Sequence, residues 1–145
     1  MKILVDGDAC PGKHIIEKVA MENNIEVTIY CDLSHYIQSD YSKVVVVDSG
    51  FQSVDMYLIN NAKSRDIIIT QDYGVAAMAL GKGVYAINPK GYIYNEDNID
   101  RLLFERHIAG KARRAGKKTG THKKRRVEDD IRLESNLRKL INNKE

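Results

Sequence analysis

Short apolar runs alternate along the chain with segments whose apolar residues recur every three or four positions. The runs are rich in β-branched residues and nearly unbroken, which is typical of strands buried on both faces of a parallel sheet. The spaced apolar residues predict amphipathic helices between these strands. Strands are expected at residues 2–5, 26–30, 44–47, 66–70 and 84–87, with a further short strand at 92–94.

The helical segments are expected from Pro11 to about Asn23 and at residues 53–63, 74–80 and 99–108. Residues 31–42 are polar and irregular and are expected to form at most a helical turn. A last amphipathic helix is predicted by five apolar residues: Ile131, Leu133, Leu137, Leu140 and Ile141. Because strand and helix alternate, the connections should be right-handed crossovers in an α/β fold with a mostly parallel central sheet.

The length and composition predict one soluble domain. A chain of 145 residues is long enough for a substantial core. No apolar run approaches the ~20 residues needed to span a bilayer, and no signal-peptide pattern follows Met1. Cys10 and Cys31 have no metal-ligand spacing and fit reduced thiols, so we expect a cytoplasmic protein with no membrane partner. Cys10 lies near a helix start, but without a histidine partner it is expected to be inert.

Positive charge is concentrated near the C-terminus. Residues 111–126 hold nine of the 23 Lys and Arg residues and no acid, although the net charge of the chain is only +3. An acidic body with a basic segment suits a protein that holds a metal in one place and a polyanion in another. The alternative, a solvated and flexible run of charge, has equal weight. The expected organisation is an α/β domain at 1–110, a basic segment at 111–126 and a C-terminal helix at 127–145.

Aspartates follow several of the predicted strands. Asp6 and Asp8 flank Gly7 after the first strand, Asp55 opens the helix after the third, and Asp72 follows the fourth. Each has a structural explanation on its own, since Asp8 and Asp72 suit helix N-caps and Asp55 suits a first turn. Together they lie near the carboxyl ends of parallel strands, where α/β proteins bind ligands. Clustered carboxylates with hard oxygen atoms favour Mg²⁺ or Mn²⁺.

The chain resembles the YaiI/YqxD family of bacterial proteins. The resemblance runs through nearly the whole chain and is carried by four segments: Val5-Asp6-Gly7-Asp8-Ala9-Cys10-Pro11, Gly50-Phe51 through Asp55, Asp66 to Asp72, and Ala86-Ile87-Asn88-Pro89-Lys90-Gly91. It implies a PIN-like, three-layer α/β fold related to metal-dependent nucleases. It also implies that Asp6, Asp8, Asp55 and Asp72 are the site residues.

The sequence departs from the family pattern at three places. Gly7 stands where alanine is usual, and Gln52 stands where the family often has another aspartate. After Thr119-Gly120 the family tends to continue Gly-Pro, whereas this chain continues Thr121-His122-Lys123-Lys124.

The sequence thus predicts a nuclease that uses Mg²⁺ or Mn²⁺ and acts on phosphodiesters, with RNA as the favoured substrate. No GxGxxG dinucleotide-binding fingerprint follows the first strand, and the sequence contains no P-loop. The expected nucleic-acid contacts are Lys13, Arg113, Arg114, Lys117, Lys118, Lys123, Lys124, Arg125 and Arg126.

Two other classes remain open. One is a phosphatase of the haloacid dehalogenase kind with Asp6 as nucleophile and Asp8 as acid/base, although no threonine stands two residues after Asp8. The other is an RNA-binding protein without catalysis that grips phosphates through residues 111–126. The oligomeric state is left open by the sequence.

Overall fold

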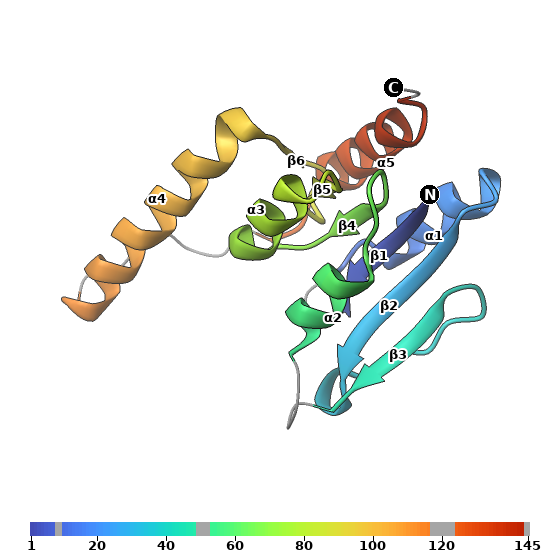
Figure 1. Ribbon diagram of the computed structural model, residues 1–145, viewed down its shortest axis with the longest axis horizontal. Helices are drawn as coiled ribbons and strands as arrows, with labels where there is room; N and C mark the ends of the chain where they lie inside the picture. Colours follow the sequence, from blue (N-terminus) through green and yellow to red (C-terminus); the bar gives the residue numbers. More distant parts are fainter. Residues whose placement is uncertain (8–9, 49–52, 117–123, 144–145) are drawn as a thin grey trace.

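Six strands form one sheet in the order β3-β2-β1-β4-β5-β6 (Figure 1). The computed structural model describes residues 1–7, 10–48, 53–116 and 124–143. The strands are β1 (Lys2–Asp6), β2 (Glu26–Asp32), β3 (Lys43–Val47), β4 (Ile67–Ile69), β5 (Tyr85–Ile87) and β6 (Ile93–Tyr94). All neighbouring strands are parallel except β5 and β6. The expected α/β fold with a mostly parallel sheet is confirmed.

Helices cover both faces of this sheet. The helices are α1 (Lys13–Glu22), α2 (Val54–Asn61), α3 (Tyr73–Gly81), α4 (Glu96–Arg114) and α5 (Val127–Ile141). Residues from α1 and α5 share one buried cluster with Ile3 and Val5. Residues from α2, α3 and α4 share another with Leu4. Because neighbouring residues of a strand point to opposite faces, the unbroken apolar runs fill both clusters, which gives the expected three layers.

Two helix boundaries differ from the sequence prediction. Pro11 and Gly12 form a turn before α1 and do not belong to its first helical turn. The helix expected to end at Ile108 continues as α4 to Arg114, so the first basic residues of segment 111–126 are helical. Lys and Arg are good helix formers, and their charge is favourable at a helix C-terminus. The apolar periodicity stops at Ile108 because the rest of α4 does not pack on the core, and Figure 1 shows this helix projecting from the sheet.

Most other elements agree with the prediction within one to three residues at their ends. A short 3-10 helix, η2 (Leu33–His35), lies in the irregular segment 31–42. The short strand expected at 92–94 is β6. None of the helices in the described ranges is long and apolar enough to cross a bilayer.

The direction of winding reverses between β1 and β4. The chain moves outward from β1 through β2 to β3, and then returns to the other side of β1 to form β4 and β5. Ile3, Leu4 and Val5 pair with Ile67, Ile68 and Ile69. At such a reversal the connections after the two central strands diverge to opposite sides, which leaves a crevice beyond their carboxyl ends. The fold therefore predicts a ligand site where β1 and β4 end.

The last helix, α5, docks on the turn after β5. Arg125 Nη1, Arg132 Nη1 and Asn136 Nδ2 donate hydrogen bonds of 2.8, 3.1 and 2.6 Å to the carbonyl oxygens of Pro89, Lys90 and Gly91. Leu133 and Leu137 are fully buried beside α1. Gly91 has a φ of +92°, and a Cβ there would lie 2.4 Å from the backbone nitrogen of Leu133. The close contact between turn and helix therefore requires glycine at position 91.

We expect Gly91→Ala to destabilise the protein by about 2–5 kcal/mol, because a positive φ and a backbone collision combine. Gly81→Ala is the control, since a Cβ at Gly81 would have no atom within 4 Å. It should change stability by less than about 1 kcal/mol. Urea denaturation of both variants measures the difference, and equal stabilities would show that the turn tolerates a side chain.

Candidate functional site

A buried threonine links the ends of the two central strands. Asp6 is the last residue of β1, and Thr70 directly follows β4. The Thr70 hydroxyl donates to Asp6 Oδ2 at 3.3 Å and accepts a hydrogen bond from the Asp72 backbone N–H at 3.0 Å. Thr70 is fully buried and Asp6 is 9% exposed. The hydroxyl therefore orients one carboxylate and fixes the backbone that carries the other.

Asp72 caps helix α3, as its position in the sequence predicts. Its Oδ1 accepts hydrogen bonds from the backbone N–H groups of Gly74 at 2.8 Å and Val75 at 3.2 Å. Arg106 Nη1, from α4, lies 3.5 Å from the same oxygen. These three contacts all involve Oδ1. Capping and ligand binding through Oδ2 are therefore compatible for this carboxylate.

Asp6 and Asp72 line one cavity of about 340 Å³, together with Gln71, Tyr73 and Arg106. It lies at the edge of the sheet where the winding reverses. The apolar pattern of the sequence predicts that α4 is a helix, but it does not indicate which basic residue of α4 faces this edge. Arg106 was therefore missed, and only the packing of α4 beside α3 identifies it.

Of the other two predicted carboxylates, only Asp55 belongs to the described residues. Asp55 is in the first turn of α2, after the N-cap Ser53, and does not line the cavity. Asp8 lies outside the described ranges. Within those ranges, no group of three or more His, Cys, Asp or Glu side chains is arranged to hold a metal ion.

Asp66 directly precedes β4 and lies at the end of the strand opposite to Thr70. Its carboxylate accepts hydrogen bonds from the backbone N–H groups of Lys2 at 3.0 Å and Lys63 at 2.8 Å. It therefore holds the amino ends of β1 and β4 together and has a structural role.

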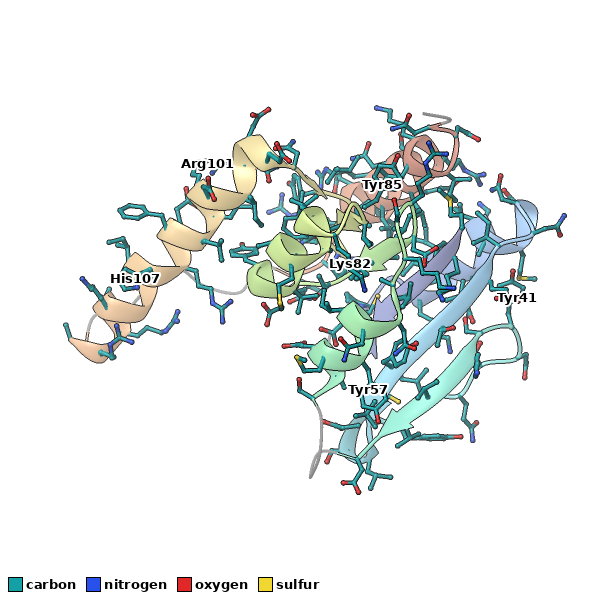
Figure 2. All side chains as sticks on the ribbon, viewed as in Figure 1. Tyr41, Tyr57, Lys82, Tyr85, Arg101 and His107 are labelled. Carbon is teal, nitrogen blue, oxygen red and sulfur yellow. The ribbon has the colours of Figure 1, made fainter. Side chains whose placement is uncertain are left out.

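The predicted phosphate-contacting residues separate into several groups. Arg113 and Arg114 line a shallow cavity of about 370 Å³ on α4, together with Arg106, His107, Leu103 and Gly110. Figure 2 shows His107 on the part of α4 that stands clear of the sheet. This end of the helix therefore presents positive charge continuous with the Asp6–Asp72 cavity through Arg106.

The remaining basic residues have other surroundings. The Lys13 ammonium donates to the carbonyl of Gln38. Arg125 holds Pro89 and also contacts Asp130, with Nη2 at 2.7 Å from the Asp130 carboxylate. Lys124 and Arg126 are exposed. Three further residues predicted to contact nucleic acid lie outside the described ranges: Lys117, Lys118 and Lys123. Gln52 also lies outside them.

Cys10 is not suited to act as a nucleophile. Burial raises the pKa of its thiol to about 11, against the smaller lowering effects of a backbone hydrogen bond and of Arg125. The thiol is therefore protonated at neutral pH. The sequence expectation of an inert cysteine agrees with this environment.

The fold and the cavity together define a class: a three-layer α/β protein with paired aspartates where the winding of its sheet reverses. The chain belongs to the family described as "Uncharacterized BCR, YaiI/YqxD family", whose sequence model matches residues 4–143. This confirms the resemblance seen in the sequence.

Proteins of nearly the same length are similar to this chain along almost its whole sequence. A UPF0178 protein of Clostridium novyi (strain NT) is 66% identical over 142 residues, which are 98% of this chain and 95% of the relative. A UPF0178 protein of Clostridium tetani is 64% identical over 141 residues, covering 97% of each chain. Among solved structures, Rae1 (YacP) from Bacillus subtilis (W164L mutant) matches with a TM-score of 0.46 and 16% identity, over 80% of this chain and 84% of that one.

We expect Thr70→Val to destabilise the protein by about 1–3 kcal/mol, because the Asp72 N–H would lose its buried acceptor and Asp6 its donor. Thr70→Ser keeps the hydroxyl and should cost less, near the ~1 kcal/mol of a lost methyl group. Hydrogen exchange at the Asp72 amide provides the direct measurement. It should accelerate in the valine variant alone, and unchanged exchange there would refute the link between the two strands.

Proposed function

We propose that this protein is a metal-dependent hydrolase of RNA phosphodiesters and that the cavity lined by Asp6, Asp72 and Arg106 is its active site. One observation carries the proposal: two carboxylates and a guanidinium share one cavity at the reversal point of the sheet. Carboxylates suit a divalent cation, and a guanidinium suits a phosphate. Both kinds of group are needed where a metal ion and a phosphodiester meet.

Two of the four predicted metal ligands, Asp6 and Asp72, line the cavity. Both supply carboxylate oxygens, which Mg²⁺ and Mn²⁺ prefer. Asp8, two residues after Asp6, is the further proposed ligand. Asp55, at the start of α2, does not line this cavity, and its role as a ligand stays a prediction of the sequence alone. The chemistry that such an ion supplies is activation of a water molecule and neutralisation of charge on the phosphate.

The chain's own residues would bind and orient the reacting groups. The Thr70 hydroxyl holds the Asp6 carboxylate in one orientation. Arg106 is 56% exposed, and its contact with Asp72 at 3.5 Å is that of a partly exposed ion pair. Such pairs contribute only about 0.2–1 kcal/mol, so the guanidinium can exchange Asp72 for a substrate phosphate at little cost. Arg106 is therefore proposed to position the phosphate.

The C-terminal end of α4 is the proposed surface for the rest of the polyanion. Arg113 and Arg114 lie on the same helix as Arg106, about two turns further on. A nucleic-acid backbone laid along this helix would meet these charges in succession. A cytoplasmic location remains part of the proposal, in agreement with two free cysteines.

We expect single-stranded RNA to be cleaved with Mn²⁺ and to stay intact with chelator. Asp72→Asn should abolish cleavage while keeping the fold, because asparagine caps a helix about as well as aspartate. At 100 times its Kd, Mn²⁺ should stabilise the native chain by ~2.7 kcal/mol and the variant by much less. Cleavage rates and melting with and without Mn²⁺ measure both effects.

The control for this variant is Asp100→Asn, which removes an exposed carboxylate of α4 outside the cavity. It should cleave RNA like the native chain. RNA binding without cleavage at any metal concentration would favour the non-catalytic binder. A trapped aspartyl-phosphate would favour the phosphatase.

We expect the double variant Arg113→Gln, Arg114→Gln to bind RNA more weakly and with a flatter salt dependence. Each lost phosphate contact lowers the slope of log K against log salt by ~0.7 for single strands, so the double variant should lose about 1.4. Lys63→Gln with Lys139→Gln removes equal charge from exposed positions outside α4. Equal slopes for the two double variants would show that only net charge matters.

A further inference from the structure

The largest of the described cavities adjoins the proposed active site. It has a volume of about 640 Å³ and shares Gln71 and Tyr73 with the Asp6–Asp72 cavity. Its other walls include Tyr92, Tyr94, Lys90 and Arg125. The volume is typical of small-molecule sites. Three tyrosines and two basic residues line this cavity, and none of its described lining residues is a carboxylate, which favours an aromatic and anionic ligand.

We propose that this cavity binds the base of the nucleotide adjacent to the scissile phosphate, with Lys90 contacting that nucleotide's own phosphate. The assignment to a substrate subsite rests on the proposed function, whereas the binding of a nucleotide does not. Binding of a base in this cavity requires a single-stranded RNA substrate, because a base that is paired and stacked in a duplex has no free face to stack on the tyrosines.

Two of the tyrosines form a fixed wall. The Tyr94 hydroxyl donates to the Thr70 carbonyl at 3.1 Å, and Tyr94 is only 4% exposed. The rings of Tyr73 and Tyr94 meet edge to face, with centroids 6.0 Å apart and planes at 69°. Such pairs favour one relative orientation. The wall next to the acidic cavity is therefore rigid before any ligand arrives.

Tyr92 is the proposed stacking platform. It is 55% exposed and belongs to the segment between the docked turn and β6. The guanidinium carbon of Arg132 lies 4.3 Å from the centroid of its ring. One face of the ring is thus covered from α5, and the ring also lines the cavity. An exposed aromatic ring that is held by a cation costs little ordering entropy when a base stacks on it.

The two basic residues of the cavity, Arg125 and Lys90, have different roles. Arg125 is committed to Pro89 and Asp130, so its guanidinium stabilises the wall. Lys90 follows Pro89 in the turn that α5 holds, and its backbone N–H donates to the Asn88 side chain at 2.6 Å. Its ammonium is therefore the group proposed to meet the phosphate, as a point charge at the end of a flexible chain.

The test measures binding of adenosine 5′-monophosphate by calorimetry, with chelator present so that no turnover occurs. Adenosine and ribose 5-phosphate are the companion probes. Tyr92→Ala should weaken adenosine and adenosine monophosphate by about 5- to 150-fold, which is the range for one lost stacking contact. Tyr92→Phe should bind like the native chain. Tyr36→Ala is the matched control, because Tyr36 is 60% exposed and lines none of the three cavities.

The variant Lys90→Gln distinguishes the contribution of the phosphate to binding from that of the base. It should weaken adenosine monophosphate but leave adenosine unchanged. Ribose 5-phosphate, which has no base, should bind more weakly than adenosine monophosphate to the native chain.

Three results would overturn the proposal: no binding of either adenosine compound, equal binding of ribose 5-phosphate and adenosine monophosphate, or native affinity in Tyr92→Ala. If one of these results is obtained and the protein still cleaves RNA with Mn²⁺, the nucleotide-binding cavity is refuted and the nuclease proposal is retained. Binding that follows the expected pattern without any cleavage would support the cavity and refute the nuclease.

Discussion

The parallel pairing of β1 with β4 is the constraint on which the candidate site depends. These strands are distant in sequence, and their three paired residues on each side are fully or almost fully buried. Their alignment brings Asp6 within hydrogen-bonding distance of Thr70, and Thr70 in turn fixes the backbone of Asp72. A shift of one residue in this pairing would turn every β4 side chain to the other face of the sheet. The core and the site are therefore specified by the same contact.

The candidate site also requires positive charge to balance its two carboxylates. Two carboxylates in one cavity repel each other unless positive charge lies among them. Arg106 supplies such charge from α4, and the same helix carries Arg113 and Arg114 beyond the body of the protein. Residues spaced by three, four or seven positions lie on one face of a helix. One long helix thus connects the acidic cavity with a basic surface, although its own end contributes little to the core.

The sequence predicted the elements well where the apolar pattern is strong. The unbroken runs identified the five parallel strands, and the spacing of Leu133, Leu137 and Leu140 identified α5. The sequence placed Asp6 and Asp72 at one edge of the sheet, because strand direction follows from crossover connections.

The sequence did not show the end of α4, whose last turns do not contact the core, nor the ion pair of Arg106 with Asp72. It also gave no sign that Arg125, one of nine clustered basic residues, would hold a turn. Such long-range contacts leave no periodic signal.

The docking of α5 has a consequence for biosynthesis. Its leucines fill the space beside α1, and its polar residues hold the turn at 88–91, so both are incomplete until residues 127–141 have left the ribosome. Apolar residues of α1, such as Ile15 and Ile16, are translated more than a hundred residues earlier. Until α5 has been synthesised, the part of α1 that packs against it stays uncovered, and an exposed apolar helix face favours association with chaperones.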